Sequence, residues 1–224
     1  DGIAFDGRYV YLVPLRDRGN EHGNMVRYDT QAAVDLPASG VVCVFDSQFG
    51  ASVVGFSGAT FDGRYMYYTA FQNDSGAHGN MVRYDTTLAF NNAAAWETYD
   101  VEAQFGSDAR AFLDQTFDGR YIYYTPYNDG SQFSGNVMRF DTQGAFNDAA
   151  SWSEINPDAM GVGTDPRGYW GAVFDGRNVH FVPIRTDWGG NEHGEVLIYD
   201  TLATSGGGAQ GQGSLDQFIQ NSNA

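Results

Sequence analysis

The chain has 224 residues, a formal net charge of −16 from 28 acidic and 12 basic residues, and an aromatic fraction of 15%. A field this negative repels nucleic-acid phosphates and anionic membrane surfaces, so we expect neither nucleic-acid binding nor membrane insertion. The single cysteine, Cys43, excludes an intrachain disulfide framework, and the apolar run around it predicts that its thiol is buried.

A segment that begins with Phe-Asp-Gly-Arg or a close variant occurs four times, at steps of 56, 56 and 57 residues, starting at Phe5, Phe61, Phe117 and Phe174. A constant period in this range is typical of propellers and other arrays built from one repeated unit. We therefore expect a single domain over 1–224, with repeats at about 1–56, 57–112, 113–169 and 170–224.

The second repeat shows the predicted elements in chain order. Residues 55–61 predict a first strand, and Asp62-Gly63 predicts a type I′ hairpin turn, which needs positive φ at both positions. Residues 64–71 predict a second strand, aromatic on both faces and therefore packed on both sides. A polar loop precedes the third strand at 80–86, and Trp96 opens the fourth. Four antiparallel strands per repeat predict an all-β fold, a four-bladed β-propeller.

These elements resemble the kelch repeat, in which a DG turn, an apolar strand, a variable loop, a YD turn and an outer tryptophan follow one another. The kelch Gly-Gly doublet is missing here, and the outer tryptophan is missing from the first and last repeats. The resemblance implies a kelch-like architecture, and a shared propeller fold says little about function. The residues that carry it are Asp62-Gly63, Tyr84-Asp85 and Trp96, followed by Asp118-Gly119, Phe140-Asp141 and Trp152.

Both ends of the chain leave the repeat pattern. The first repeat starts later within its unit than the others do, so we expect that preceding residues complete it. A secreted mature protein, extracellular or periplasmic, is consistent with that start. A Gly-rich stretch leads to Ser214–Gln220, which predicts either the last outer strand or a strand that closes the ring against the first repeat. The alternative is that the chain is part of a larger propeller.

The segments that repeat and the segments that vary map to opposite faces of a propeller. The Asp-Gly-Arg and Tyr-Asp-Thr turns share one face, and an Arg–Asp ion pair in each repeat would hold the two turns together. The predicted pairs are Arg8–Asp29, Arg64–Asp85, Arg120–Asp141 and Arg177–Asp200. The other face carries polar, acidic and aromatic loops, as expected for binding loops on a rigid frame.

A histidine followed by glycine or its replacement occupies one loop position in every repeat: His22, His78, Ser134 and His193. Three interpretations stay open for the histidines. Each one bonds a carbonyl or aspartate of its own loop, or contacts a ligand, or joins the others in a metal site for Zn²⁺ or Cu²⁺. Calcium is a second metal candidate, because Asn128–Gly130 and Gln72–Asp74 offer oxygen ligands. No motif requires a cofactor.

Aromatic residues on this second face predict a sugar-binding surface. A flat apolar ring beside directional polar groups is what carbohydrate recognition needs, although loop aromatics also cover the edges of cores. We expect exposed or half-exposed rings at Trp188, Trp170, Tyr169 and Phe133, with carboxylates at Asp74, Asp129 and Asp187. His180, in contrast, aligns with Tyr11 and Tyr67 and is predicted to pack in place of a tyrosine.

No nucleophile elbow, phosphate loop, Cys–His pair or metalloprotease motif is present. We therefore predict an extracytoplasmic module that binds carbohydrate or another small neutral polar ligand. Whether it is also an enzyme stays open: a metal-dependent or polysaccharide-degrading enzyme would act through the loops of His22, His78 and His193. A third alternative is a structural propeller that binds a protein partner or a second copy of itself.

Overall fold

The computed structural model describes residues 2–32, 40–44, 50, 52–203 and 218–221, without the side chains of 41–44 and 218–221. The prediction for the thiol of Cys43 therefore lies outside the described residues. The regular secondary structure of the described chain is nearly all β, in four antiparallel sheets of four strands and two short hairpins. The prediction of four antiparallel strands in each repeat is confirmed.

The first two sheets contain the first two repeats, with the strands in chain order across each sheet. The first sheet consists of β1 (Ile3–Phe5), β2 (Tyr9–Leu12), β5 (Asn24–Asp29) and β6 (Gly40–Val44). The second consists of β7 (Phe56–Phe61), β8 (Tyr65–Ala70), β11 (Asn80–Asp85) and β12 (Trp96–Asp100). The two hairpins extend the loops between the second and third strands: β3 (Arg16–Asp17) with β4 (Asn20–Glu21), and β9 (Gln72–Asn73) with β10 (Gly76–Ala77).

The third and fourth sheets repeat this order. The third consists of β13 (Phe112–Phe117), β14 (Tyr121–Pro126), β15 (Val137–Asp141) and β16 (Trp152–Ile155). The fourth consists of β17 (Tyr169–Phe174), β18 (Asn178–Pro183), β19 (Val196–Asp200) and β20 (Phe218–Asn221). Short helices join the outer strands to their neighbours: η2 (Ala93–Ala95), α2 (Val101–Phe105) and η3 (Ala149–Ser151).

Each Asp-Gly-Arg turn is a three-residue hairpin loop, so the predicted type I′ turn is wrong. In the second sheet Gly63 has a φ of +106°, whereas Asp62 is not among the residues with positive φ. The Oδ1 atom of Asp62 instead accepts hydrogen bonds from the backbone N–H groups of Arg64 (2.8 Å) and Tyr65 (2.6 Å). Because the aspartate side chain caps the loop, left-handed backbone is needed only at the glycine.

The sheets stack face to face in chain order. We call the side of a sheet that packs on the preceding sheet its rear face, and the opposite side its front face. Three buried clusters lie between consecutive sheets. Neighbouring residues of one strand enter different clusters: Tyr68 on the rear face packs with the first sheet, and Tyr67 on the front face packs with the third. The predicted strand with aromatic residues on both faces is confirmed.

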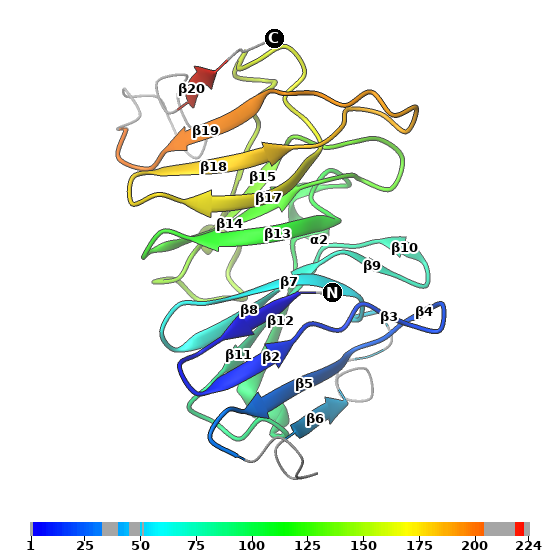
Figure 1. Ribbon diagram of the computed structural model, residues 1–224, viewed down its shortest axis with the longest axis vertical. Helices are drawn as coiled ribbons and strands as arrows, with labels where there is room; N and C mark the ends of the chain where they lie inside the picture. Colours follow the sequence, from blue (N-terminus) through cyan, green and yellow to red (C-terminus); the bar gives the residue numbers. More distant parts are fainter. Residues whose placement is uncertain (1, 33–39, 45–49, 51, 204–217, 222–224) are drawn as a thin grey trace.

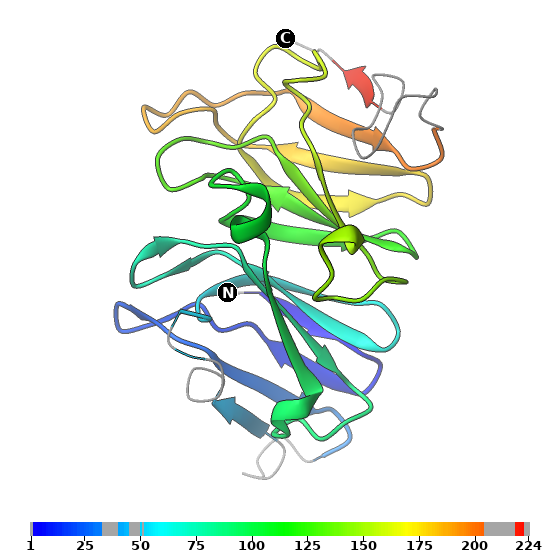
Figure 2. The ribbon, with the colours of Figure 1, turned by 180° about the vertical axis from the view of Figure 1, so that it is seen from behind.

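The four sheets form an open row over the described residues, and the predicted four-bladed ring is not confirmed. Strand β1 packs beside β7, β7 beside β13, and β13 beside β17. The outer strands β6 and β20 lie at opposite ends of the molecule in both views (Figures 1 and 2). Strand β20 pairs with β19, so the C-terminal segment supplies the outer strand of the fourth sheet, one of the two roles predicted for it.

The tight turns gather on one side of the row, which we call the turn face, and the predicted Arg–Asp pairs are confirmed there. In each sheet the arginine Nη2 lies 2.6–2.7 Å from a carboxylate oxygen of the aspartate. The aspartate of each Asp-Gly-Arg turn also accepts a hydrogen bond from a side chain of the second strand, at 2.7–2.9 Å: Tyr11, Tyr67, Tyr123 or His180. His180 therefore replaces a tyrosine, as predicted.

Candidate pocket on the loop face

The loops between second and third strands and the segments between sheets lie on the side opposite the tight turns, at the right of Figure 1, which we call the loop face. A pocket of about 160 Å³ opens on this face between the third and fourth sheets. Three segments line it: the residues after α2, the loop between β14 and β15, and the long connection between β16 and β17. It combines loops from neighbouring repeats, where ligands are commonly bound.

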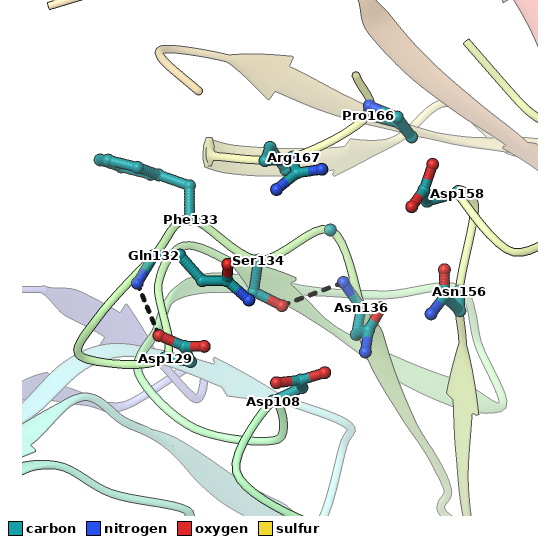
Figure 3. Close-up of a pocket in the computed structure, with 11 residues that line it drawn as sticks. Asp108, Asp129, Gln132, Phe133, Ser134, Asn136, Asn156, Asp158, Pro166 and Arg167 are labelled. Atoms are coloured by element: carbon teal, nitrogen blue, oxygen red, sulfur yellow. Dashed lines mark hydrogen bonds between the residues drawn. The ribbon is translucent and has the colours of Figure 1, made fainter. Parts of the chain in front are cut away.

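The lining of the pocket is mainly polar (Figure 3). It carries carboxylates, amides, a hydroxyl and one guanidinium, from Asp108, Asp129, Asp158, Gln132, Asn136, Asn156, Ser134 and Arg167. Arg167 forms an ion pair with Asp165 just outside the pocket. The exposed carboxylate of Asp108 forms no hydrogen bond or ion pair with another described residue, so it is available to a ligand.

The pocket lies where the third repeat departs from the other three. The hydroxyl of Ser134 accepts a hydrogen bond from the N–H of Asn136 at 3.2 Å, as Nδ1 of His78 does from Asn80. The imidazole of His78 then reaches further, and its Nε2 lies 2.8 Å from the carbonyl oxygen of Val54. A serine keeps the first contact and lacks the ring. Figure 3 shows Asp108 facing Ser134 from the segment between the sheets.

Gly135 allows the two walls of the pocket to approach each other. A Cβ atom at this position would lie only 2.0 Å from the carbonyl oxygen of Pro166. The N–H of Gly168 donates a hydrogen bond of 2.9 Å to the carbonyl oxygen of Ser134, which fixes the same wall. Backbone this close excludes any larger residue, so Gly135, like Gly79 in the second repeat, serves the contact between neighbouring repeats.

The pKa values of Asp129, which lines the pocket, and of Glu154, which accepts a hydrogen bond from the lining residue Asn136, are shifted in opposite directions. Burial raises the pKa of Asp129, but donation from the backbone and hydroxyl of Ser131 and the N–H of Gln132 outweighs it, and the net pKa is lowered. Burial raises the pKa of Glu154, and the nearby charge of Asp108 raises it further against the opposing hydrogen bond from Asn136. Asp129 is therefore a firm anion that shapes its own turn.

An exposed tryptophan lies beside this pocket. The ring centroid of Trp188 is 4.7 Å from that of Phe133, and its Nε1 donates to the carbonyl oxygen of Ser131 at 3.2 Å. Trp188 is 58% exposed, as predicted. Phe133, however, is buried, because the rings of Tyr127 and Trp188 pack on it.

The other two predicted aromatics have different surroundings. Trp170 is exposed but does not line the pocket. Tyr169 is fully buried, and its ring packs on Phe181 and His193 in the cluster between the third and fourth sheets. The expected exposure of Tyr169 and of Phe133 is therefore wrong. Tyr169 stands at the loop-proximal end of the inner strand β17 and completes the core, whereas Phe133 lies in the loop between β14 and β15 and is covered by Tyr127 and Trp188.

The three histidines lie each in the loop of its own repeat. His78 is buried, and burial lowers its pKa. Nε2 of His193 lies 3.3 Å from the carbonyl oxygen of Gly168, and Nδ1 of His22 accepts from the N–H of Asn24 at 3.2 Å. Among the described residues, no group of three or more His, Cys, Asp or Glu side chains is placed to hold a metal ion. These contacts fit the loop-structuring interpretation, and the metal site stays a prediction.

The remaining predicted carboxylates and the calcium segments bond mainly to backbone N–H groups. Asp74 accepts from the N–H of Glu21 in the first repeat at 3.4 Å. Asp187 accepts from both the backbone and the side chain of Asn191, and the backbone bond is the main cause of its lowered pKa. The Oδ1 of Asn128 accepts from the N–H of Gly130 at 2.8 Å.

Most of the pocket was not predicted from the sequence. Asp129 was, whereas Asp108, Asn156, Asp158 and Arg167 were not singled out, because they stand in connections between sheets whose path the repeat does not define. Two signals in the sequence point there nevertheless. Ser134 is the one departure from histidine at its position, and the connection before β17 is the longest between described sheets.

No family model and no curated protein matches the chain. Among solved structures it is similar to PorZ, a bacterial surface component of the type-IX secretion system of the human oral bacterium Porphyromonas gingivalis. The identity is 14% and the TM-score 0.39, over 90% of this chain and 27% of that one. The chain thus spans about a quarter of PorZ, and a likeness at this score bears on neither site nor function. None of the helices in the described ranges is long and apolar enough to cross a membrane.

Proposed function

We propose that the chain is an extracytoplasmic binding protein with kelch-like propeller blades, and that the pocket between the third and fourth sheets binds a small neutral polar ligand, a sugar unit. The observation that carries the proposal is the combination of this polar pocket with the exposed ring of Trp188 beside it. Hydroxyl groups of a sugar can both donate to carboxylates and accept from amides and a guanidinium, and its apolar face can stack on an aromatic ring.

The charges and the size of the pocket narrow the ligand class. Three carboxylates, Asp108, Asp129 and Asp158, face one guanidinium, Arg167, which is already paired. Together with a net charge of −16 this disfavours phosphorylated or sulfated ligands. A volume of 160 Å³ holds about five water molecules at ~30 Å³ each, which suits one small ligand or one terminal residue of a chain.

The test is binding of neutral mono- and oligosaccharides, first on a glycan array and then by calorimetry, with wild type and two variants. Ser134→His restores the residue of the other repeats and directs an imidazole toward the segment of Asp108. We expect it to fold normally and to bind at least tenfold more weakly. Trp188→Ala removes the ring beside the pocket and should also weaken binding. Trp170→Ala is the matched control, because its ring is equally exposed, at 58%, and does not line the pocket.

Two results would overturn the proposal: no neutral glycan bound by wild type, or equal binding by wild type and Ser134→His. Repeating the titration after removal of divalent cations tests the calcium prediction in the same experiment. Loss of binding that Ca²⁺ restores would show that the carboxylates hold the ligand through a cation, whereas unchanged binding would assign recognition to direct hydrogen bonds. Metal analysis of a His22→Ala/His78→Ala variant beside wild type tests the remaining zinc and copper prediction.

A further inference from the structure

The rear face of the first sheet is apolar and open. Paired residues across β1, β2 and β5 form two rows on this face, Ile3–Leu12–Val26 and Phe5–Val10–Tyr28. Ile3, Phe5 and Leu12 are 68%, 54% and 46% exposed. An exposed apolar patch made of adjacent side chains, rimmed by polar turns, is typical of a surface that another protein covers.

The rear face of the second sheet, which has the same pattern of residues, is covered by another sheet. Its rows in the same register are Ala59–Tyr68–Val82 and Phe61–Met66–Tyr84. They belong to the cluster that packs against Tyr11, Val13 and Met25 on the front face of the first sheet. In the second, third and fourth sheets, therefore, a rear face is covered by the front face of the sheet before it.

The front face of the fourth sheet is open along the inner strands β17 and β18, whereas Ile198 on β19 is buried. Val173 and Val182 are each more than half exposed, and Val196 lies beside them on β19. Trp170, also exposed, stands where Ser57 stands in the second sheet. Since the hydroxyl of Ser57 donates to the carbonyl oxygen of Phe112 in the following sheet, the position of Trp170 faces the place of a next sheet.

Each end face lacks one side chain of the internal contacts. At two of the three internal contacts, an arginine on the front face donates to a tyrosine hydroxyl on the next rear face: Arg27 to Tyr84 (2.9 Å) and Arg139 to Tyr199 (3.0 Å). Ile198 replaces this arginine in the fourth sheet.

The rear face of the first sheet keeps the tyrosine, as Tyr28, and lacks the tryptophan beside it. The outer-strand tryptophan that pairs across from Tyr84 in the second sheet is Trp96, and in the first sheet Gly40 pairs across from Tyr28 instead. Because Ile198 is uncharged, this front face can pack on the apolar rear face of the first sheet without burying a guanidinium.

We propose that two copies of this chain join end to end, with the front face of the fourth sheet of one copy packed on the rear face of the first sheet of the other. The contact continues the blade-to-blade interface already formed three times within the chain. The first and fourth sheets both lie at the front of the molecule in Figure 1, with the second and third sheets behind them, so a two-fold axis can form both contacts at once. Two copies of four sheets make a ring of eight, within the size range of propellers.

The experiment measures mass by sedimentation and light scattering over a hundredfold concentration range, at about 0.15 M and 0.5 M salt. Wild type should have twice the mass of one chain. The fraction of dimer should rise at high salt, because screening weakens the repulsion between two copies that each carry a net charge of −16. Leu12→Asp and Val182→Asp each place a charge on one end face and should give monomers. Leu88→Asp is the control, since it puts the same charge on an exposed leucine away from both faces.

A mixture of the two monomeric variants tests whether the two end faces bind each other. Each variant retains one intact end face, so an equimolar mixture of Leu12→Asp and Val182→Asp should recover a dimer held by one contact. Far-UV spectra and melting curves establish that both variants are folded. A monomeric wild type at every concentration overturns the proposal, as does a dimer of Val182→Asp alone, which would require a contact between two identical faces. Monomers that stay separate on mixing overturn it as well.

Discussion

The turn face and the loop face use aspartate in two different ways. Asp62 on the turn face bonds the backbone of its own loop and also accepts a hydrogen bond from Tyr67, a buried core residue. Asp129 on the loop face also accepts three hydrogen bonds, but all come from Ser131 and Gln132 in its own turn. The first pattern recurs in every sheet and anchors turns to the core. The second pattern is local to its turn and shapes a pocket.

The largest expected loss of stability is that of Asp62→Ala, compared with Asp129→Ala. Asp62→Ala leaves the hydroxyl of Tyr67 without its partner and should lower the free energy of unfolding by about 2–3 kcal/mol. Asp129→Ala breaks as many hydrogen bonds, all local, and should cost about 1 kcal/mol. Urea unfolding of both variants measures the difference. Equal losses would contradict the division into an anchoring face and a ligand face.

His78→Ser places in the second repeat the residue that the third repeat has at this position, Ser134. The variant loses a buried contact of 2.8 Å to the carbonyl oxygen of Val54 and leaves a void, so we expect a loss of about 1–2 kcal/mol at pH 7.5. Melting temperature and urea midpoint are the measurements. His22→Ser is the control, because the imidazole of His22 is only partly buried, and its loss should be smaller.

The same variant has a predictable pH dependence. Burial lowers the pKa of His78 below its ordinary 6.5, so the unfolded chain binds a proton more readily than the folded one. The contribution of His78 is therefore fully present above pH 6.5 and is lost as the pH falls through the lowered pKa. The gap between wild type and His78→Ser should accordingly narrow from pH 7.5 to pH 5. A gap that widens on acidification would refute the assignment of a neutral, buried imidazole.

An intermediate effect of opposite sign is expected at Asp114 on the inner strand β13. Burial raises its pKa, and the hydrogen bonds that its carboxylate accepts from the backbone of Gln115 and of Ala172, the latter 3.4 Å long, do not offset this. A raised carboxyl pKa means that the folded state disfavours the charge, a cost that is absent below the ordinary pKa and complete above the raised one. Asp114→Asn should therefore stabilise the protein by on the order of 1 kcal/mol at pH 7, and by less near pH 4. Urea unfolding at both pH values is the measurement.

The sequence predicted most of the repeated part of the fold and little of the pocket. Strand boundaries, the Arg–Asp pairs and the role of His180 follow from period and position, because each of four copies repeats the same local chemistry. The turn type was missed because the Asp62 side chain, and not its backbone conformation, closes the loop.

Closure and the pocket depend on relations between repeats, which a repeated motif does not encode. The curvature of the row is set by how each front face seats on the next rear face. The pocket arises where long connections meet a missing imidazole at Ser134. Tyr169 and Phe133 were predicted as exposed because they stand beside loop residues, yet both are buried. The parts that differ between repeats are thus the least predictable and the most informative about function.

The smallest expected effect lies in the Arg–Asp pairs, although they recur in every sheet. Arg64 is mostly exposed, and its pair with Asp85 competes with water and salt, so Arg64→Ala should leave the urea midpoint nearly unchanged. Asp85 also accepts from the backbone and hydroxyl of Thr87, so Asp85→Ala should lose about 1 kcal/mol. Similar losses for the two variants, both reduced in 1 M salt, would mean that the ion pair itself stabilises the turn face. A loss confined to Asp85→Ala would show that the aspartate recurs for its own turn, with the arginine adding orientation more than stability.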